Sequence, residues 1–160
     1  EMHGHLGESG AMLNLLAGVT GVRDMGNSNS VLDALDRRII AGEVAGPRIV
    51  RSGFVEGKSP FSANNGFVVD SEARAVEAVR WYAARGFTTI KIYNSVNPQW
   101  VPALVAEARR LGLRVMGHVP AFTSADAMIA AGKKAGKGGS HQTHQAVLSK
   151  SPFHGRGGSL

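Results

Sequence analysis

The stretch GFTTIKIYNSVNP, residues 86–98, joins two predicted helices through a short apolar strand at residues 88–93. The helix before it, predicted over residues 71–85, follows an aspartate suited to an N-cap and stops at a glycine. The helix after it, predicted over residues 98–111, begins with a proline, which loses no hydrogen bond in a first helical turn. A strand enclosed in this way by two helices is typical of a parallel α/β sheet.

The same alternation of strand and helix extends in both directions from this stretch. Further strands are predicted at residues 2–6, 19–24, 48–52 and 114–118, and further helices at residues 29–41 and 124–131. The longest interruption is the loop 54–69, which is rich in Gly, Ser and Asn and is long enough to cover a site. Alternating elements imply parallel strands with right-handed crossovers, so we predict about five βα units in residues 1–132.

The composition changes after Gly132. Residues 133–160 hold five of the 18 Lys and Arg residues, none of the 12 acidic residues, and six glycines with little periodicity. We therefore predict a flexible, basic C-terminal tail at residues 133–160, to which most of the net charge of +6 belongs. Phe153 is its only aromatic residue, so stacking on nucleic-acid bases is poorly supported and nucleic acid is not an expected partner.

The bulk composition narrows the class of protein. A chain of 160 residues with 43% hydrophobic and 19% charged residues is typical of one globular domain. No run approaches the roughly 18 apolar residues that cross a bilayer, and no signal-peptide pattern is present, so we expect a cytoplasmic protein without a membrane partner. The chain has no cysteine, so a metal ion must be held by His, carboxylate or Lys-derived groups.

Two histidines stand at the start of the chain, in MHGHLG. His3 and His5 occupy alternate positions of a predicted strand, so both side chains point to the same face. Two imidazoles at that spacing can reach one metal ion, and Gly4 leaves room for the ion near the backbone. Solvated histidines or a tag remnant at a chain end give the same pattern. The pair alone leaves both interpretations open.

Two further polar residues stand at strand ends. Lys91 interrupts the apolar strand 88–93 near its C-terminal end, and His118 ends the next strand. Each alone also fits a structural role, as a lysine that reaches solvent or a hydrogen-bonded histidine. With His3 and His5, however, they place four candidate metal ligands on the first, fourth and fifth predicted strands. The C-terminal ends of parallel barrel strands converge on one rim, where such folds carry their chemistry.

The order of several motifs resembles the metal-dependent amidohydrolase superfamily, with imidazolonepropionase-, dihydroorotase- and prolidase-type members as the nearest comparison. The motifs are MHGHLG (2–7), AGVTGVRDMGN (17–27), AGPRIV (45–50), GFTTIKIY (86–93), LGLRVMGHVP (111–120) and AMIAAG (127–132). The resemblance covers roughly residues 2–132. It implies a (β/α)8 TIM barrel of which this chain holds about five units, that is, a partial barrel in the α/β class.

The resemblance also implies roles for the four candidates. His3 and His5 match the strand-1 pair that binds the more buried metal ion, and His118 matches a strand-5 ligand of the second ion. Lys91 matches the strand-4 lysine, which is often carboxylated by carbon dioxide and bridges two ions. The cofactor implied is a divalent metal, Zn²⁺ as one or two ions, which would acidify a water molecule and polarise a scissile carbonyl.

Two family ligands have no clear counterpart. The strand-6 histidine would fall near Gly138, where His141 and His144 are the nearest substitutes; they are better explained as histidines of a flexible tail. The strand-8 aspartate, which takes the proton of the attacking water, is not found, so no catalytic base is identified. Tyr93 and Asn94 follow Lys91, and Arg51 lies at the predicted end of strand 48–52, so these three are candidates for contact with a small-molecule substrate.

Two hypotheses of function follow. The first is a metal-dependent hydrolase that cleaves amide or cyclic amide C–N bonds with metal-activated water. The second is a truncated amidohydrolase fragment without independent catalysis, because a whole barrel needs about 250 residues and the chain has 160. An open half-barrel exposes unpaired strand edges, so the second hypothesis predicts a homo-oligomer that covers them.

Overall fold

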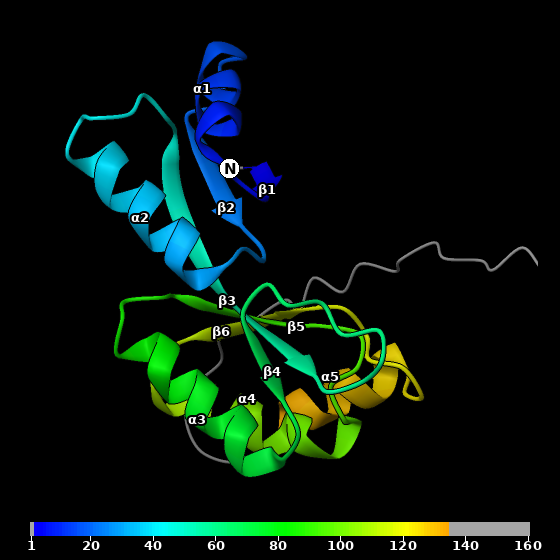
Figure 1. The fold of residues 1–160 in the computed structure, drawn as a ribbon. Helices are drawn as coiled ribbons and strands as arrows, with labels where there is room; N and C mark the ends of the chain where they lie inside the picture. Colours follow the sequence, from blue (N-terminus) through cyan, green and yellow to red (C-terminus); the bar gives the residue numbers. More distant parts are fainter. Residues whose placement is uncertain (1, 135–160) are drawn as a thin grey trace, which may run out of the picture.

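Five parallel strands form the main sheet. The computed structural model describes residues 2–134, and the structural statements below refer to these residues. The strand order is β1 (Met2–Gly4), β2 (Gly21–Asp24), β3 (Arg48–Gly57), β5 (Thr89–Ile92) and β6 (Arg114–Gly117), with every neighbouring pair parallel. A short strand, β4 (Phe67–Val69), pairs with the end of β3. The sheet is curled into a half-barrel (Figure 1).

A helix follows each of these five strands along the chain. The helices are α1 (Glu8–Leu16), α2 (Asn29–Ile40), α3 (Glu72–Ala83), α4 (Val101–Arg110), which the 3-10 turn η1 (Pro98–Trp100) precedes, and α5 (Ala125–Lys134). The prediction of about five βα units in a partial barrel is therefore confirmed. Helix α5 continues slightly past the predicted boundary at residue 132. The rest of the predicted tail, residues 135–160, lies outside the described residues.

The predicted helix ends are close to the observed ones. The N-cap of α3 is Ser71, whose side chain accepts a hydrogen bond from the Arg74 backbone N–H at 3.3 Å, and not the preceding Asp70. Gly86 and Gly112 follow α3 and α4 with φ angles of 74° and 75°. This left-handed conformation is readily adopted by glycine, which explains why both helices end there.

The prediction of a loop over residues 54–69 is wrong at both ends. Strand β3 continues through Gly57, and β4 occupies the last residues of the segment. Phe54 and Val55 are buried, as is the charged residue Glu56, which looked like a loop residue in the sequence. Helix α1 was not predicted at all, because only Ala11 of its nine residues is buried and the apolar periodicity is correspondingly weak.

Strand β3 joins two parts of the molecule. Its first residues, 48–51, pair with β2, whereas residues 52–55 pair with β5. We call residues 2–47, with β1, α1, β2 and α2, the N-terminal half, and residues 52–134 the C-terminal half. In Figure 1 the first lies above the second, and the long β3 runs from one into the other.

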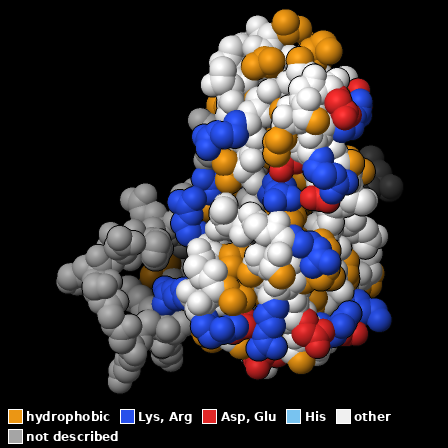
Figure 2. Space-filling view, turned by 90° about the vertical axis from the view of Figure 1, so that its left-hand side faces the viewer, with side chains coloured by type: hydrophobic (Ala, Val, Ile, Leu, Met, Phe, Trp, Pro, Cys, Tyr) orange, Lys and Arg blue, Asp and Glu red, His pale blue; other side chains and the backbone are white. Residues whose placement is uncertain are grey.

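Apolar side chains remain on the surface of the N-terminal half. Figure 2 shows hydrophobic side chains at the top of the molecule, the end that α1 and the α2–β3 loop form. On α1 the exposed ones include Met12, Leu13 and Leu16. None of the described helices combines the length and the apolar character needed to cross a membrane. Among residues 2–134 the outer edges of β1 and β6 have no strand partner, and self-association through them stays a prediction.

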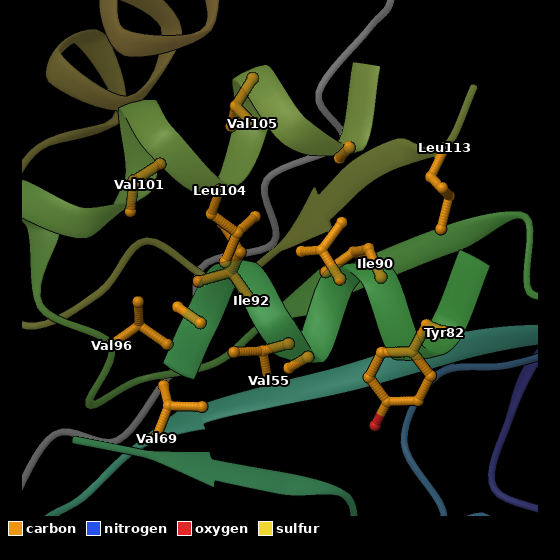
Figure 3. Packing of buried hydrophobic residues seen from close by; sticks show 14 of the residues in the cluster. Val55, Val69, Tyr82, Ile90, Ile92, Val96, Val101, Leu104, Val105 and Leu113 are labelled. Carbon is orange, nitrogen blue, oxygen red and sulfur yellow. The ribbon is translucent and has the colours of Figure 1, made fainter. Parts of the chain in front are cut away.

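The main hydrophobic core lies in the C-terminal half. Ile90 and Ile92 of β5 and Val55 of β3 face α3 and α4, which contribute Tyr82 and Leu104 (Figure 3). The Tyr82 hydroxyl donates to the Phe54 carbonyl oxygen at 2.9 Å, so its polar end is satisfied inside the core. A separate, smaller cluster lies in the N-terminal half: Leu6, Ala11, Val22, Leu35 and Val44.

Candidate functional site

The four predicted ligands lie at the C-terminal ends of three strands. His3 is on β1 and His5 follows it, Lys91 is on β5, and His118 directly follows β6. The His3 and His5 rings are 5.4 Å apart between centroids in an edge-to-face arrangement. Lys91 is 3% exposed, whereas His118 is half-buried. Most of the lysine side chain thus lies inside the fold.

Burial and the charges of neighbouring candidate ligands both lower the pKa values of His3 and His118. Burial lowers the pKa of His3, and the positive charges of Lys91 and then His5 lower it further. Burial also lowers the pKa of His118, followed by the charges of Lys91 and His3. Because the neighbouring strands from β1 to β6 are parallel, the ends that carry these residues lie at the same edge of the sheet.

Lys91 sits in an unusual environment for an amine. Its Nζ lies 5.2 Å from the centroid of the Tyr93 ring and 5.8 Å from that of Phe54. Burial lowers the pKa of Lys91 below its usual 10.5, and the charge of Asp24 partly opposes this shift. Among the described residues no hydrogen bond to Nζ is present. Such an amine is more readily deprotonated than a surface lysine, and only a neutral amine can act as a nucleophile or metal ligand.

Two of the three imidazoles are held in a defined tautomer. His5 Nδ1 lies 2.7 Å from the Gly26 carbonyl oxygen, which can only accept, so Nδ1 carries the hydrogen. His118 Nδ1 lies 2.8 Å from Oδ1 of Asn94, and with the amide in this orientation Nδ1 is the donor. In the neutral ring the lone pair is then on Nε2. Holding the remote ring nitrogen by an oxygen acceptor is how proteins orient metal-binding histidines.

Of the three residues predicted to contact substrate, two lie at the rim and one does not. The Tyr93 ring packs against His118, with 4.4 Å between ring centroids, and Asn94 binds His118, so both lie at the rim. Arg51 does not: the prediction that it ends a strand is wrong, because β3 continues for six residues beyond it. Its guanidinium binds Asp33 and Asp36 of α2 at 2.9 and 3.3 Å, on the helical side of the sheet.

Sequence reasoning missed two buried carboxyl groups at this end of the sheet. Asp24 ends β2 and Glu56 lies near the end of β3, and both are fully buried. Backbone N–H groups donate to both side chains. In the sequence, Asp24 beside Arg23 at a strand end suggests a structural ion pair at the rim, and Glu56 falls in the predicted loop 54–69. Neither pattern indicates a buried acceptor.

The donor set fits a metal ion only in part. Among residues 2–134, no three side chains of the His, Asp and Glu types are grouped so that they could hold a metal ion. His3, His5 and His118 supply imidazole nitrogens at this end of the sheet, and Lys91 supplies an amine without an anionic oxygen. Carboxylation of Lys91 would supply the missing anionic oxygens. His141 and His144 lie outside the described residues.

Comparisons with known proteins identify the fold. No family model and no curated protein matches the chain. Among solved structures, a bottromycin amidohydrolase is 26% identical, with a TM-score of 0.68 over 82% of this chain and 30% of that one. The structure of this chain matches the amidohydrolase family. A prolidase from Bifidobacterium longum, described as putative, and a molinate hydrolase have the same fold at 24% and 21% identity, with TM-scores of 0.63 and 0.54.

The structural alignments cover most of this chain but a smaller share of each matched protein. The prolidase alignment covers 85% of this chain and 37% of that one, and the molinate hydrolase alignment 76% and 35%. The chain thus spans about a third of the length of the amidohydrolases that it matches.

Proposed function

We propose that this chain carries the ligands His3, His5, Lys91 and His118 of a Zn²⁺ centre in a metal-dependent hydrolase. The reaction class is cleavage of a C–N bond in an amide or cyclic amide of a small molecule. The amidohydrolase fold and the strand positions of the four residues support this assignment. A bound divalent ion would supply an acidified water molecule and a polarised substrate carbonyl.

One observation carries the proposal. His5 and His118, which come from opposite edges of the sheet, are both held through Nδ1 by an oxygen acceptor, at 2.7 and 2.8 Å. Both therefore have Nε2 available for a metal ion. A histidine used only for packing has no need of this shared arrangement, whereas a ligand needs its ring orientation and tautomer fixed.

Lys91 fits the role of a carboxylated lysine. Its neutral amine would attack carbon dioxide, forming an N–C bond and releasing one proton, and the product carbamate is an anionic oxygen donor. The low exposure of Lys91 and its lowered pKa favour the neutral amine that this reaction needs. Zn²⁺ accepts nitrogen and oxygen ligands together, so a carbamate and three imidazoles form a suitable donor set.

The other rim residues would shape the surroundings of the centre. Tyr93 covers one side of the His118 ring and limits its rotation, and Asn94 fixes its tautomer. Both stand beside the position that a substrate would take. Their contact with substrate is part of the proposal, as in the sequence-based prediction.

Metal binding without hydrolysis is the second candidate function. Hydrolysis needs a group that takes the proton of the attacking water. The two buried carboxyl groups near the rim are already used as acceptors: Asp24 on both oxygens, and Glu56 on Oε1 and, from the Ala63 N–H at 3.5 Å, on Oε2. This observation favours a chain that binds the ion and lacks its own catalytic base.

Metal content tests the proposal. The purified chain, loaded with Zn²⁺ and then dialysed, is expected to retain about one ion or more per chain, and the variant His3→Ala/His5→Ala is expected to lose it. The control is His154→Ala, which removes a histidine that is not a candidate ligand and should retain the ion. An unmodified chain without zinc, or a His3→Ala/His5→Ala variant with unchanged zinc, contradicts the proposal.

Turnover separates the two candidates. The zinc-loaded chain is assayed on N-acyl amino acids, dipeptides and lactams, with the His3→Ala/His5→Ala variant as control. Hydrolysis that disappears in the variant supports the enzyme. Tight zinc binding without hydrolysis of any of them supports the second candidate.

A further inference from the structure

The buried carboxyl groups of Asp24 and Glu56 have no role in the proposed centre so far. Each lies at the C-terminal end of a strand next to the strands that carry the ligands, and each is fully buried. A buried carboxyl group destabilises the fold unless its oxygens accept hydrogen bonds. The segments that supply those hydrogen bonds therefore indicate what each group does.

Asp24 ties the segment after β1 to the segment after β2. Its Oδ2 accepts from the Leu6 N–H at 2.8 Å, and its Oδ1 accepts from the Gly26 N–H at 3.2 Å. The Asn27 amide bridges the same two segments by donating to Asp24 Oδ2 and to the Leu6 carbonyl. Gly26 is the residue whose carbonyl accepts from His5 Nδ1. Asp24 thus fixes both the histidine backbone and its acceptor.

The backbone conformation and position of Gly26 are restricted by its neighbours. Its φ angle is 145°, and a Cβ atom on it would lie 2.7 Å from the Phe54 ring. The peptide is therefore confined between that ring and the Asp24 carboxyl group. Loss of the carboxyl group releases one side of this confinement.

Glu56 acts in the same way on the other side of the rim. Its Oε1 accepts from the Ser95 N–H at 2.7 Å and from the Gly57 N–H at 2.9 Å. Ser95 follows Asn94, whose side chain accepts from His118 Nδ1, and whose carbonyl accepts from the Ala121 N–H at 2.8 Å. Because Asn94 is exposed, water competes for its amide, and a fixed backbone is what keeps that amide beside His118.

Close packing strengthens the contact between Glu56 and Ser95. A Cβ atom on Gly57 would lie 1.8 Å from the Ser95 carbonyl oxygen, so the end of β3 and the turn after β5 touch at backbone level. Any movement of Glu56 is therefore transmitted to the turn that carries Asn94.

We propose that Asp24 and Glu56 are paired positioning residues, each of which fixes the acceptor that sets the tautomer of one imidazole. Asp24 does this for His5 through Gly26, and Glu56 does it for His118 through Asn94. The link to metal affinity rests on the proposed function, whereas the control of the tautomers does not. Without its fixed acceptor, an imidazole populates both neutral tautomers, and Nε2 is then blocked by hydrogen in part of the molecules.

The tautomers are measured on the metal-free chain by ¹⁵N NMR of labelled histidines, at a pH where the rings are neutral. In the unmodified chain His5 and His118 should both be Nδ1–H. Asp24→Asn should shift His5 toward a mixture and leave His118 unchanged, and Glu56→Gln should do the reverse. Glu107→Gln is the control, because its carboxyl group binds Arg80 and Arg110, outside the rim. Unchanged tautomers in both variants, or equal changes of both rings in each, overturn the proposal.

A second variant keeps the test decisive if a carboxyl variant does not fold. Asn94→Ala removes the acceptor of His118 at an exposed position and retains Glu56. It should shift the His118 tautomer as Glu56→Gln does, and the double variant should shift it no further. An unchanged His118 tautomer in Asn94→Ala contradicts the proposal that Glu56 acts on His118 through Asn94.

Zinc affinity gives the functional readout. Asp24→Asn and Glu56→Gln should each weaken Zn²⁺ binding by about 10–100-fold, as the loss of residues that orient metal ligands does, while Glu107→Gln should leave it unchanged. Shifted tautomers with unchanged zinc affinity overturn the link to the metal. A chain that binds no zinc refutes the proposed function alone, because the tautomers still decide the present inference.

Discussion

Both halves of the molecule contribute residues to the rim, but their hydrophobic cores differ in size. The N-terminal half, which carries His3 and His5, has its own cluster of five buried residues, whereas the cluster near Lys91 and His118 has sixteen, all in the C-terminal half except Leu32 of α2. Buried apolar area is the main source of stability, so the C-terminal half is held in place far more strongly. The difference teaches that the strands carrying Lys91 and His118 are held by extensive packing, whereas those carrying His3 and His5 depend more on the hydrogen bonds around Asp24.

The largest expected effect is on stability, from truncation in the two cores. Leu104→Ala removes a fully buried side chain from the large cluster, and we expect a loss of about 4–5 kcal/mol in the free energy of unfolding. Leu35→Ala in the small cluster has more room to relax, and we expect about 2–3 kcal/mol. Urea unfolding measures both. Equal losses in the free energy of unfolding would contradict the difference between the two cores.

Local opening should also differ between the halves. Backbone amides of β1 and β2 are expected to exchange with solvent at least about tenfold faster than those of β5, because fewer buried contacts hold them. Hydrogen exchange followed by NMR gives this ratio residue by residue. Added Zn²⁺ should reduce it, since an ion shared by His3, Lys91 and His118 links the halves. A ratio near one without metal refutes the unequal stability.

A smaller effect concerns the ion pairs that Glu107 of α4 forms with Arg80 of α3 and with Arg110 of its own helix. Hydrogen bonds from Arg110 and Arg80 lower the pKa of Glu107 from the usual 4.5 to about 2. A lowered pKa stabilises the fold above the ordinary value, and this contribution is lost as the pH falls toward 2. Both guanidinium groups are more than half exposed, so we expect Glu107→Gln to lose only about 1 kcal/mol at neutral pH.

The pH dependence checks the sign of this effect. The stability difference between the unmodified chain and Glu107→Gln should be constant above pH 4.5 and shrink as the pH is lowered toward 2. Urea unfolding at several pH values measures it. A difference that grows on acidification would show that Glu107 is not held by the two arginines.

Much of the fold and the rim positions could be predicted from the sequence, because they depend on local patterns. The strand 88–93 and its flanking helices follow from apolar periodicity and helix-end signals, and Lys91 interrupts that pattern visibly. The end of β3 could not be predicted, since Glu56 is a charged residue whose burial depends on N–H groups of Ser95 and Gly57. This one error also put Arg51 at the rim, where the structure does not have it.

The hydrogen bonds that orient the site histidines could not be predicted from the sequence either. The hydrogen bond from His5 to Gly26 spans 21 positions in the sequence, and that from His118 to Asn94 spans 24. No local pattern reports such pairs, because they form only when separate strands come together in the sheet. The sequence therefore predicts candidate ligands, and the structure is needed to see what orients them.

The central claim is that His3, His5 and His118, with Lys91, form one metal centre across the two halves. It is tested most directly by titrating Zn²⁺ into the ¹⁵N-histidine-labelled chain and following every ring nitrogen by NMR. We predict that Nε2 of His5 and His118 shifts together with a ring nitrogen of His3, with the same equivalence point and the same apparent affinity. Zinc-dependent shifts confined to His141 and His144, or no shift in any of these rings, would contradict the claim.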